Sequence, residues 1–96
     1  MTFEVALSPS AKEDLAYLKA FEQRILIAVI KEYLLVDADV ETKRRKRLRE
    51  NPVAPWELKQ EPYRVFYDIV GDRVEILAIG YKEHNELFIR GRRVEL

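Results

Sequence analysis

The chain has 96 residues, of which 48% are hydrophobic and 35% are charged, and its 17 Lys and Arg residues balance its 17 Asp and Glu residues. This composition predicts one globular domain over residues 1–96 and excludes the fibrous and disordered classes. No cysteine is present for disulfides or thiolate chemistry, no apolar run nears the ~18 residues of a membrane helix, and the start lacks the pattern of a secretion signal. We therefore expect a cytoplasmic protein with no membrane contact.

The N-terminal part of the sequence predicts a strand followed by two helices. Residues 3–7 mostly alternate apolar and polar side chains, as in a strand. Two helix starts overlap after it: Ser8 with Pro9 at the first helical position, or a capping box over residues 10–13. The first helix is expected to end near Ala20, and the second to run from about residue 22 to about residue 36.

The second helix has more apolar side chains than one face can hold, since a surface helix needs an apolar face only about 100° wide. One stripe of these side chains can cover the sheet. The surplus over residues 25–36 packs under the first helix, which is the simpler interpretation, or forms a docking surface for another molecule.

Residues 37–55 predict a long polar connection, of which residues 41–50 are compatible with a helix. The connection changes the charge balance of the chain. Residues 1–42 contain 4 Lys and Arg against 8 Asp and Glu, and the remainder contains 13 against 9. Such a separation favours a basic face that meets an anion, although a solvated loop is the alternative. The candidate anion contacts in the basic run are Lys43, Arg44, Arg45, Lys46, Arg47 and Arg49.

The C-terminal half predicts an antiparallel meander. The period changes to two at Trp56, residues 60–62 turn the chain, and residues 63–70 form a strong strand. Gly71 and Asp72 suit a two-residue II′ hairpin loop, followed by a strand over residues 73–79 that ends at Gly80. A last short strand is expected over residues 87–89. The predicted fold class is α+β, with two N-terminal helices on one face of a twisted antiparallel sheet in the order β-α-α-β-β-β.

The other face of this sheet is predicted to be open and polar. If Val65, Tyr67 and Ile69 face the helices, then Arg64 and Phe66 face outward. A hairpin around residues 61–62 places Lys59 opposite Arg64, and Glu57 opposite Phe66, at about 5 Å. Lys82 and His84 follow on the next strand.

These side chains suit the cleavage of RNA, which supplies its own nucleophile in the 2′-hydroxyl. In this hypothesis Glu57 is the base, Arg64 stabilises the developing charge with Lys59 and Lys82, and His84 is the acid, so no metal and no cofactor is needed. Phe66, Tyr81 and Phe88 are candidates to stack on a base. The structural alternatives are a surface ion pair between Arg64 and Glu57, worth about 0–1 kcal/mol, and a merely exposed histidine.

Four segments of the sequence resemble one known family. LSPSAKEDLAYL resembles its first helix, KRLRENPVAPWELK its basic connection, YRVFYDI its Tyr-Arg-x-x-Tyr strand, and ILAIGYKEHNELFIRG its last core strand and tail. The family is the RelE/ParE superfamily of bacterial toxins from toxin–antitoxin systems. The resemblance covers nearly the whole chain and implies a microbial-ribonuclease-like fold and a cognate antitoxin as partner. On this implication the antitoxin-binding surface comprises Ile25, Val29, Tyr33 and Val36.

The resemblance implies one of two activities. RelE-like members cleave mRNA on the ribosome, whereas ParE-like members inhibit DNA gyrase by binding; an inactive relative kept for antitoxin binding is a third alternative. The family's strand arginine corresponds to Arg64, and its basic residue after the last core strand corresponds to Lys82. Where well-studied RelE members have two lysines and a tail tyrosine, this sequence has Pro55, Glu57 and Phe88. Other members use a glutamate and a histidine, which favours roles for Glu57 and His84.

Overall fold

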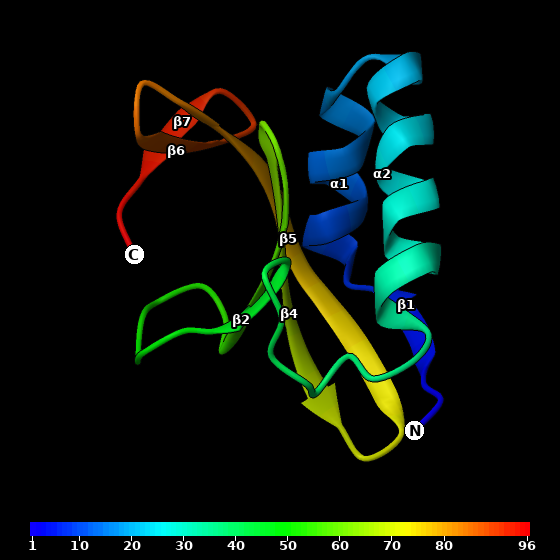
Figure 1. The fold of residues 1–96 in the computed structure, drawn as a ribbon. Helices are drawn as coiled ribbons and strands as arrows, with labels where there is room; N and C mark the ends of the chain where they lie inside the picture. Colours follow the sequence, from blue (N-terminus) through cyan, green and yellow to red (C-terminus); the bar gives the residue numbers. More distant parts are fainter.

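The computed structural model describes all 96 residues as two helices on one face of a seven-stranded sheet (Figure 1). The elements in chain order are β1 (Glu4–Leu7), α1 (Pro9–Tyr17), α2 (Ala20–Leu34), β2 (Arg45–Arg47), β3 (Trp56–Gln60), β4 (Tyr63–Val70), β5 (Arg73–Glu83), β6 (Glu86–Ile89) and β7 (Arg92–Val94). The strands run in the order β2-β3-β4-β5-β6-β7, and β1 pairs with β5. The α+β class and the two-helix layer are confirmed. Neither helix is both long and apolar enough to cross a membrane.

The first of the two predicted helix starts is the one used. The Ser8 hydroxyl accepts a hydrogen bond from the Ala11 N–H at 3.0 Å, with Pro9 at the first helical position. Helix α2 begins at Ala20, two residues earlier than predicted, because the Glu22 carboxylate accepts the Lys19 N–H at 3.1 Å. It ends at Leu34.

The main core lies between the helices and the sheet, and the predicted facing of β4 is confirmed. Val65 and Tyr67 are buried in this core, and Ile69 packs against it. The Tyr67 hydroxyl donates a hydrogen bond to the Ala38 carbonyl at 2.8 Å, and its ring stacks on Trp56 with centroids 5.8 Å apart. The polar tip of a fully buried tyrosine is thus satisfied by the chain that follows α2.

Strand β5 is longer than the sequence predicts, because it continues through Gly80 to Glu83. It pairs with β4 over Arg73–Tyr81, with β1 in parallel over Arg73–Ile76, and with β6 over Tyr81–Glu83. A Cβ atom at position 80 would overlap the carbonyl oxygen of Phe88, so glycine permits the close approach of β6. The prediction that Gly80 ends the strand is therefore wrong.

The long connection contains a strand where the sequence was compatible with a helix. Residues 41–50 form no helix, and β2 pairs antiparallel with β3. Arg45 lies opposite Leu58 and Arg47 opposite Trp56, so the β2 arginines follow the period of two set by β3.

A second, smaller core covers part of the face that the sequence predicts to be open. Phe66 is fully buried there with Ala54, Ala78 and Leu87, and the loop residues Leu48 and Val53 pack against them. The loop after β2 and the β6–β7 hairpin project from this face, on the side opposite the helices (Figure 1). Phe66 does face away from the helices, but the expectation that its ring is exposed for stacking is wrong, because these side chains enclose it.

Candidate nucleic-acid interface

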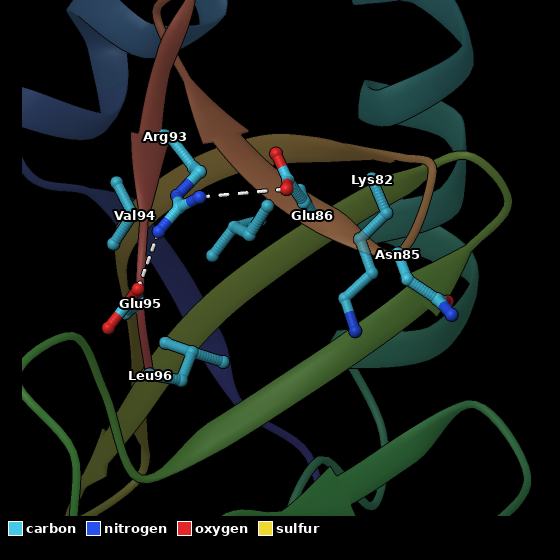
Figure 2. Close-up of a pocket in the computed structure, with 8 residues that line it drawn as sticks. Lys82, Asn85, Glu86, Arg93, Val94, Glu95 and Leu96 are labelled. Carbon is cyan, nitrogen blue, oxygen red and sulfur yellow. Dashed lines mark hydrogen bonds and ion pairs between the residues drawn. The ribbon is translucent and has the colours of Figure 1, made fainter.

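Two adjoining hollows lie on the face away from the helices. The larger, of 520 Å³, is lined by Lys46, Arg47, Leu48, Arg49, Glu50, Asn51, Glu57, Lys82 and Leu96. The other, of 450 Å³, is lined by residues of the β5–β6 turn, β6 and the C-terminal residues 93–96 (Figure 2). Lys82 and Leu96 line both, so the hollows meet at these two side chains. Strands β2, β3 and β5 thus contribute to one concave surface.

The larger hollow is basic. Its lining has four cations, from Lys46, Arg47, Arg49 and Lys82, and two carboxylates, from Glu50 and Glu57. Lys46 lies opposite Glu57 across the β2–β3 ladder, so both side chains share a face of the sheet. Neither Lys46 nor Lys82 is in an ion pair with any carboxylate of the protein. Both ammonium groups are therefore available to an anionic ligand.

Beside this hollow lies a buried ion pair between β3 and β4. The side chains of Arg64 and Glu57 are only 6% and 12% exposed, and Arg64 Nε lies 3.6 Å from a Glu57 carboxylate oxygen. Arg64 Nη1 donates a hydrogen bond to the Tyr63 carbonyl at 2.9 Å, whereas Nε has no hydrogen-bond partner. The sequence alternatives were an exposed catalytic guanidinium or a surface pair. The structure instead encloses this guanidinium away from the helices and holds it against a carboxylate.

Lys59 and Arg64 also meet at one carboxylate of the β3–β4 turn. The two residues are cross-strand partners, as the sequence predicts. One oxygen of Glu61 lies 3.3 Å from Lys59 Nζ and 3.1 Å from Arg64 Nη2. The hydrogen bond from Arg64 lowers the pKa of Glu61 below its usual value, and Lys59 adds to this effect. Glu61 is thus ionised at neutral pH and lies between two cations.

The basic run at residues 43–49 divides between the two faces of the sheet. Arg45 donates hydrogen bonds from Nη1 to the Tyr33 carbonyl and from Nε to the Val40 carbonyl, both at 2.9 Å. The Tyr33 carbonyl lies in the last turn of α2, a position that favours a cation, and Val40 lies in the connection after the helix. The guanidinium of Arg44 lies 4.8 Å from the ring centre of Tyr33. Two of the six candidate anion contacts, Arg44 and Arg45, therefore line neither hollow.

The remaining basic residues of the run are more exposed. The Arg47 guanidinium lies 5.7 Å from the ring centre of the core residue Trp56, although Arg47 also borders the hollow. Lys46 and Arg49 line the hollow, and Lys43 is exposed and lines neither one. Of the six predicted anion contacts, Lys46 and Arg49 are the two that line the hollow without an aromatic or carbonyl partner of their own.

Three further predicted site residues lie outside both hollows. His84 is exposed in the β5–β6 turn, where both His84 and Asn85 have positive φ, of 53° and 65°. Tyr81 and Phe88 stack on each other with centroids 5.7 Å apart, and Tyr81 packs against the main core. The structure therefore does not bring the histidine or these two rings to Glu57.

Apart from Lys82, the residues of the smaller hollow were not predicted from the sequence. Asn85 and Lys82 lie on one side of it, and Arg93 lies on the other between Glu86 and Glu95, at 3.6 Å and 2.6 Å (Figure 2). The positive φ values of His84 and Asn85 identify a two-residue I′ hairpin loop between β5 and β6. Asn85 between two strand-like segments could have indicated this loop. β7 has only three residues and no comparable signal.

The predicted docking surface on α2 is partly internal. Val29 is only 7% exposed and belongs to the main core, and Tyr33 packs against it, so the expectation that Val29 lies on a docking surface is wrong. Ile25 and Val36 are 39% and 50% exposed, and Phe21, one turn before Ile25, is 52% exposed. Phe21 and Ile25 thus form an apolar patch near the start of α2 that the main core does not cover, and Val36 is exposed just beyond the end of the helix.

The arrangement of two helices against a curved sheet with a basic hollow behind it defines a class, the RelE-like toxin fold. A solved structure with this fold is the toxin–antitoxin complex RelBE2 (Rv2865-2866) from Mycobacterium tuberculosis, which matches with a TM-score of 0.69 over 85% of this chain and 100% of that one. The two sequences are 19% identical, so this likeness concerns the fold. The sequence matches no curated protein.

The family follows from the sequence itself. Residues 5–86 match the family described as "ParE toxin of type II toxin-antitoxin system, parDE". This match spans most of the chain, and the chain therefore belongs to the ParE toxin family within the RelE/ParE superfamily. It is a toxin of a type II toxin–antitoxin system, and a cognate antitoxin is its partner.

Proposed function

We propose that this toxin arrests translation in the cytoplasm by binding mRNA on the ribosome in the larger hollow and cleaving it. One observation carries the proposal: two unpaired lysines, Lys46 and Lys82, line the same hollow as Glu57, a carboxylate held by Arg64. Cations that neutralise phosphates give affinity without sequence preference, which suits a protein whose target is set by where it docks.

The chemistry assigned to the hollow uses three side chains. Glu57 accepts the proton of the RNA 2′-hydroxyl, whose oxygen then attacks the adjacent phosphorus. Lys46 stabilises the extra negative charge on the phosphorane, and the ammonium of Lys82 gives a proton to the departing 5′-oxygen. Arg64 holds the Glu57 carboxylate in place and does not itself contact the substrate. His84, outside the hollow, has no role in this scheme.

Lys82→Ala is expected to lower the rate of mRNA cleavage by about 100-fold or more, because it removes both a phosphate contact and the proton donor. The measurement is primer extension on mRNA incubated with ribosomes and purified toxin. Lys12→Ala, an exposed lysine on α1, is the matched control and should cleave normally. Unchanged cleavage by a folded Lys82→Ala protein would rule out this mechanism.

Inhibition of DNA gyrase by binding is the second candidate function. It is favoured by the match to the ParE family and by the position of His84 away from Glu57. In this case the toxin leaves ribosome-bound mRNA intact and inhibits supercoiling of plasmid DNA by purified gyrase. The same purified protein in both assays separates the two candidates.

We further propose that the antitoxin covers the exposed apolar side chains of Phe21 and Ile25 on α2 and of Val36 just after it. Ile25→Asp is expected to weaken antitoxin binding by about 10-fold or more, because it places a charge in an apolar interface. Isothermal titration with the purified antitoxin measures the change. Arg24→Asp, a neighbour on the same helix, is the control, and equal losses for both variants would place the interface elsewhere.

A further inference from the structure

We propose that a third hollow, where α1 and α2 meet the ends of β4 and β5, binds the guanidinium group of an arginine side chain that a protein partner presents. The hollow has a volume of 390 Å³, and its lining includes Tyr17, Lys19, Glu22, Tyr63 and Tyr81. It shares no residue with the larger or the smaller hollow, so it is a separate site that the proposed cleavage of RNA does not use.

The carboxylate of this hollow has no cation beside it. Glu22 is half-buried, and one of its oxygens accepts the Lys19 N–H at 3.1 Å while the other accepts the Tyr63 hydroxyl at 2.8 Å. Glu22 forms no ion pair with any basic group of the protein. Both donors are uncharged, and an ionised carboxylate has about four acceptor positions, so about two remain for a cationic ligand.

Three tyrosine rings complete the lining. Tyr17 is 56% exposed, Tyr63 is buried, and Tyr81 packs against the main core, so the aromatic surface extends from the solvent to the core. The faces of aromatic rings attract cations. A guanidinium group is planar and weakly hydrated, and it can stack on a ring while it donates two hydrogen bonds to a carboxylate. The combination of rings and a carboxylate therefore suits arginine better than lysine.

Two of the tyrosines show the effect of the Glu22 charge. Burial, followed by the hydrogen bond and the charge of Glu22, raises the pKa of Tyr63 to about 12. Burial also raises the pKa of Tyr81, with smaller contributions from Tyr17, Glu83 and Glu22. Burial disfavours a charge of either sign, whereas the contribution of Glu22 disfavours an anion and favours a cation.

Lys19 limits the affinity of the site. Its side chain lines the hollow, and its ammonium group repels a bound cation. Lys19 is exposed and forms no ion pair with Glu22 or with any other carboxylate, so its side chain can turn toward the solvent. The hollow is thus suited to one arginine within a larger protein interface.

The test is an NMR titration of the purified toxin with N-acetyl-arginine amide at constant ionic strength, followed through the backbone N–H signals of Lys19 and Glu22. N-acetyl-citrulline amide has nearly the same shape without the charge and is not expected to bind. Glu22→Gln should weaken binding of the arginine probe by about threefold or more. Tyr17→Leu, at an exposed ring, should weaken it by about two- to fivefold. Lys19→Ala should tighten it by about two- to threefold.

Glu32→Gln is the matched control, because Glu32 is an exposed carboxylate on the same helix that does not line the hollow. Equal binding of the citrulline probe, or equal losses in Glu22→Gln and Glu32→Gln, would overturn the inference. Free L-arginine, titrated in parallel, separates the two sources of a guanidinium group. It should bind no more tightly than the capped form; tighter binding that Lys19→Ala abolishes would indicate a small-molecule ligand and rule out the protein partner.

Discussion

Arg64→Ala is expected to destabilise the folded toxin by about 3–5 kcal/mol, because it leaves the nearly buried carboxylate of Glu57 without its partner. The loss also frees the Tyr63 carbonyl from its hydrogen bond to Nη1. Urea denaturation followed by circular dichroism measures the free energy of unfolding. If this variant no longer arrests growth, its stability must be measured before the loss is attributed to an effect on catalysis.

A second variant separates charge burial from packing at the same place. Arg64→Met combined with Glu57→Leu removes both charges and keeps apolar volume, and it should recover most of the lost stability, since buried ion pairs are often replaceable by packed apolar side chains. If Arg64→Ala alone unfolds at the same urea concentration as the natural protein, the pair is not buried as described. The double variant should fold and yet fail to cleave mRNA, because Glu57 is absent.

Phe66→Ala is expected to cost about 3–5 kcal/mol of stability through the cavity it leaves in the smaller core. That core holds the loop of Leu48 and Val53 onto the sheet, and the same loop supplies one wall of the larger hollow. The variant should therefore lose phosphate and RNA affinity together with stability. Thermal unfolding and a filter-binding assay with single-stranded RNA give the two readouts.

Two controls make the result on Phe66 specific. Phe66→Leu retains most of the volume and should lose less than Phe66→Ala. Phe88→Ala removes a ring that is only partly buried and lies outside both hollows, so it should lose less stability and no RNA affinity. Loss of RNA affinity without loss of stability in Phe66→Ala would indicate direct stacking on RNA, contrary to the observed burial.

The fold was predictable where the signals are local. Pro9 and Ser8 fix the start of α1, and the alternation in β4 correctly assigns Val65 and Tyr67 to the helix side. A II′ turn has a positive φ at its first central residue only. Gly71 has a φ of 62° and Asp72 does not have a positive φ, so the predicted turn is confirmed. Each of these features depends on residues within a few positions of one another.

The features that were missed depend on distant residues. Strand β2 is a run of arginine and lysine whose strand character comes from pairing with Leu58 and Trp56. The extension of β5 beyond Gly80 depends on the close approach of Phe88. Local propensity takes no account of either partner. The sequence was therefore compatible with a helix at residues 41–50 and predicted that the strand ends at Gly80.

In the candidate site, too, the features that depend on local residues were predictable, and those that depend on distant residues were not. The pairing of Lys59 with Arg64 and of Glu57 with Phe66 followed from the turn at residues 61–62 and is confirmed. A period of two in the sequence predicts which face of the sheet a side chain occupies. It does not predict what covers that face. Leu48, Val53 and Ala54 cover Phe66, and Glu61 pairs with Arg64, neither of which was predicted from the sequence.

The central place of β5 has a consequence for the timing of synthesis. β1 pairs with residues 73–76, and β4 and β6 also pair with β5, so the full sheet cannot assemble until this late segment has left the ribosome. Before then the apolar faces of α1 and α2 lack the core side chains that β5 supplies, Val74, Ile76 and Ile79. We therefore expect the nascent toxin to stay harmless to the ribosome that makes it, and to become active only when its translation is nearly finished.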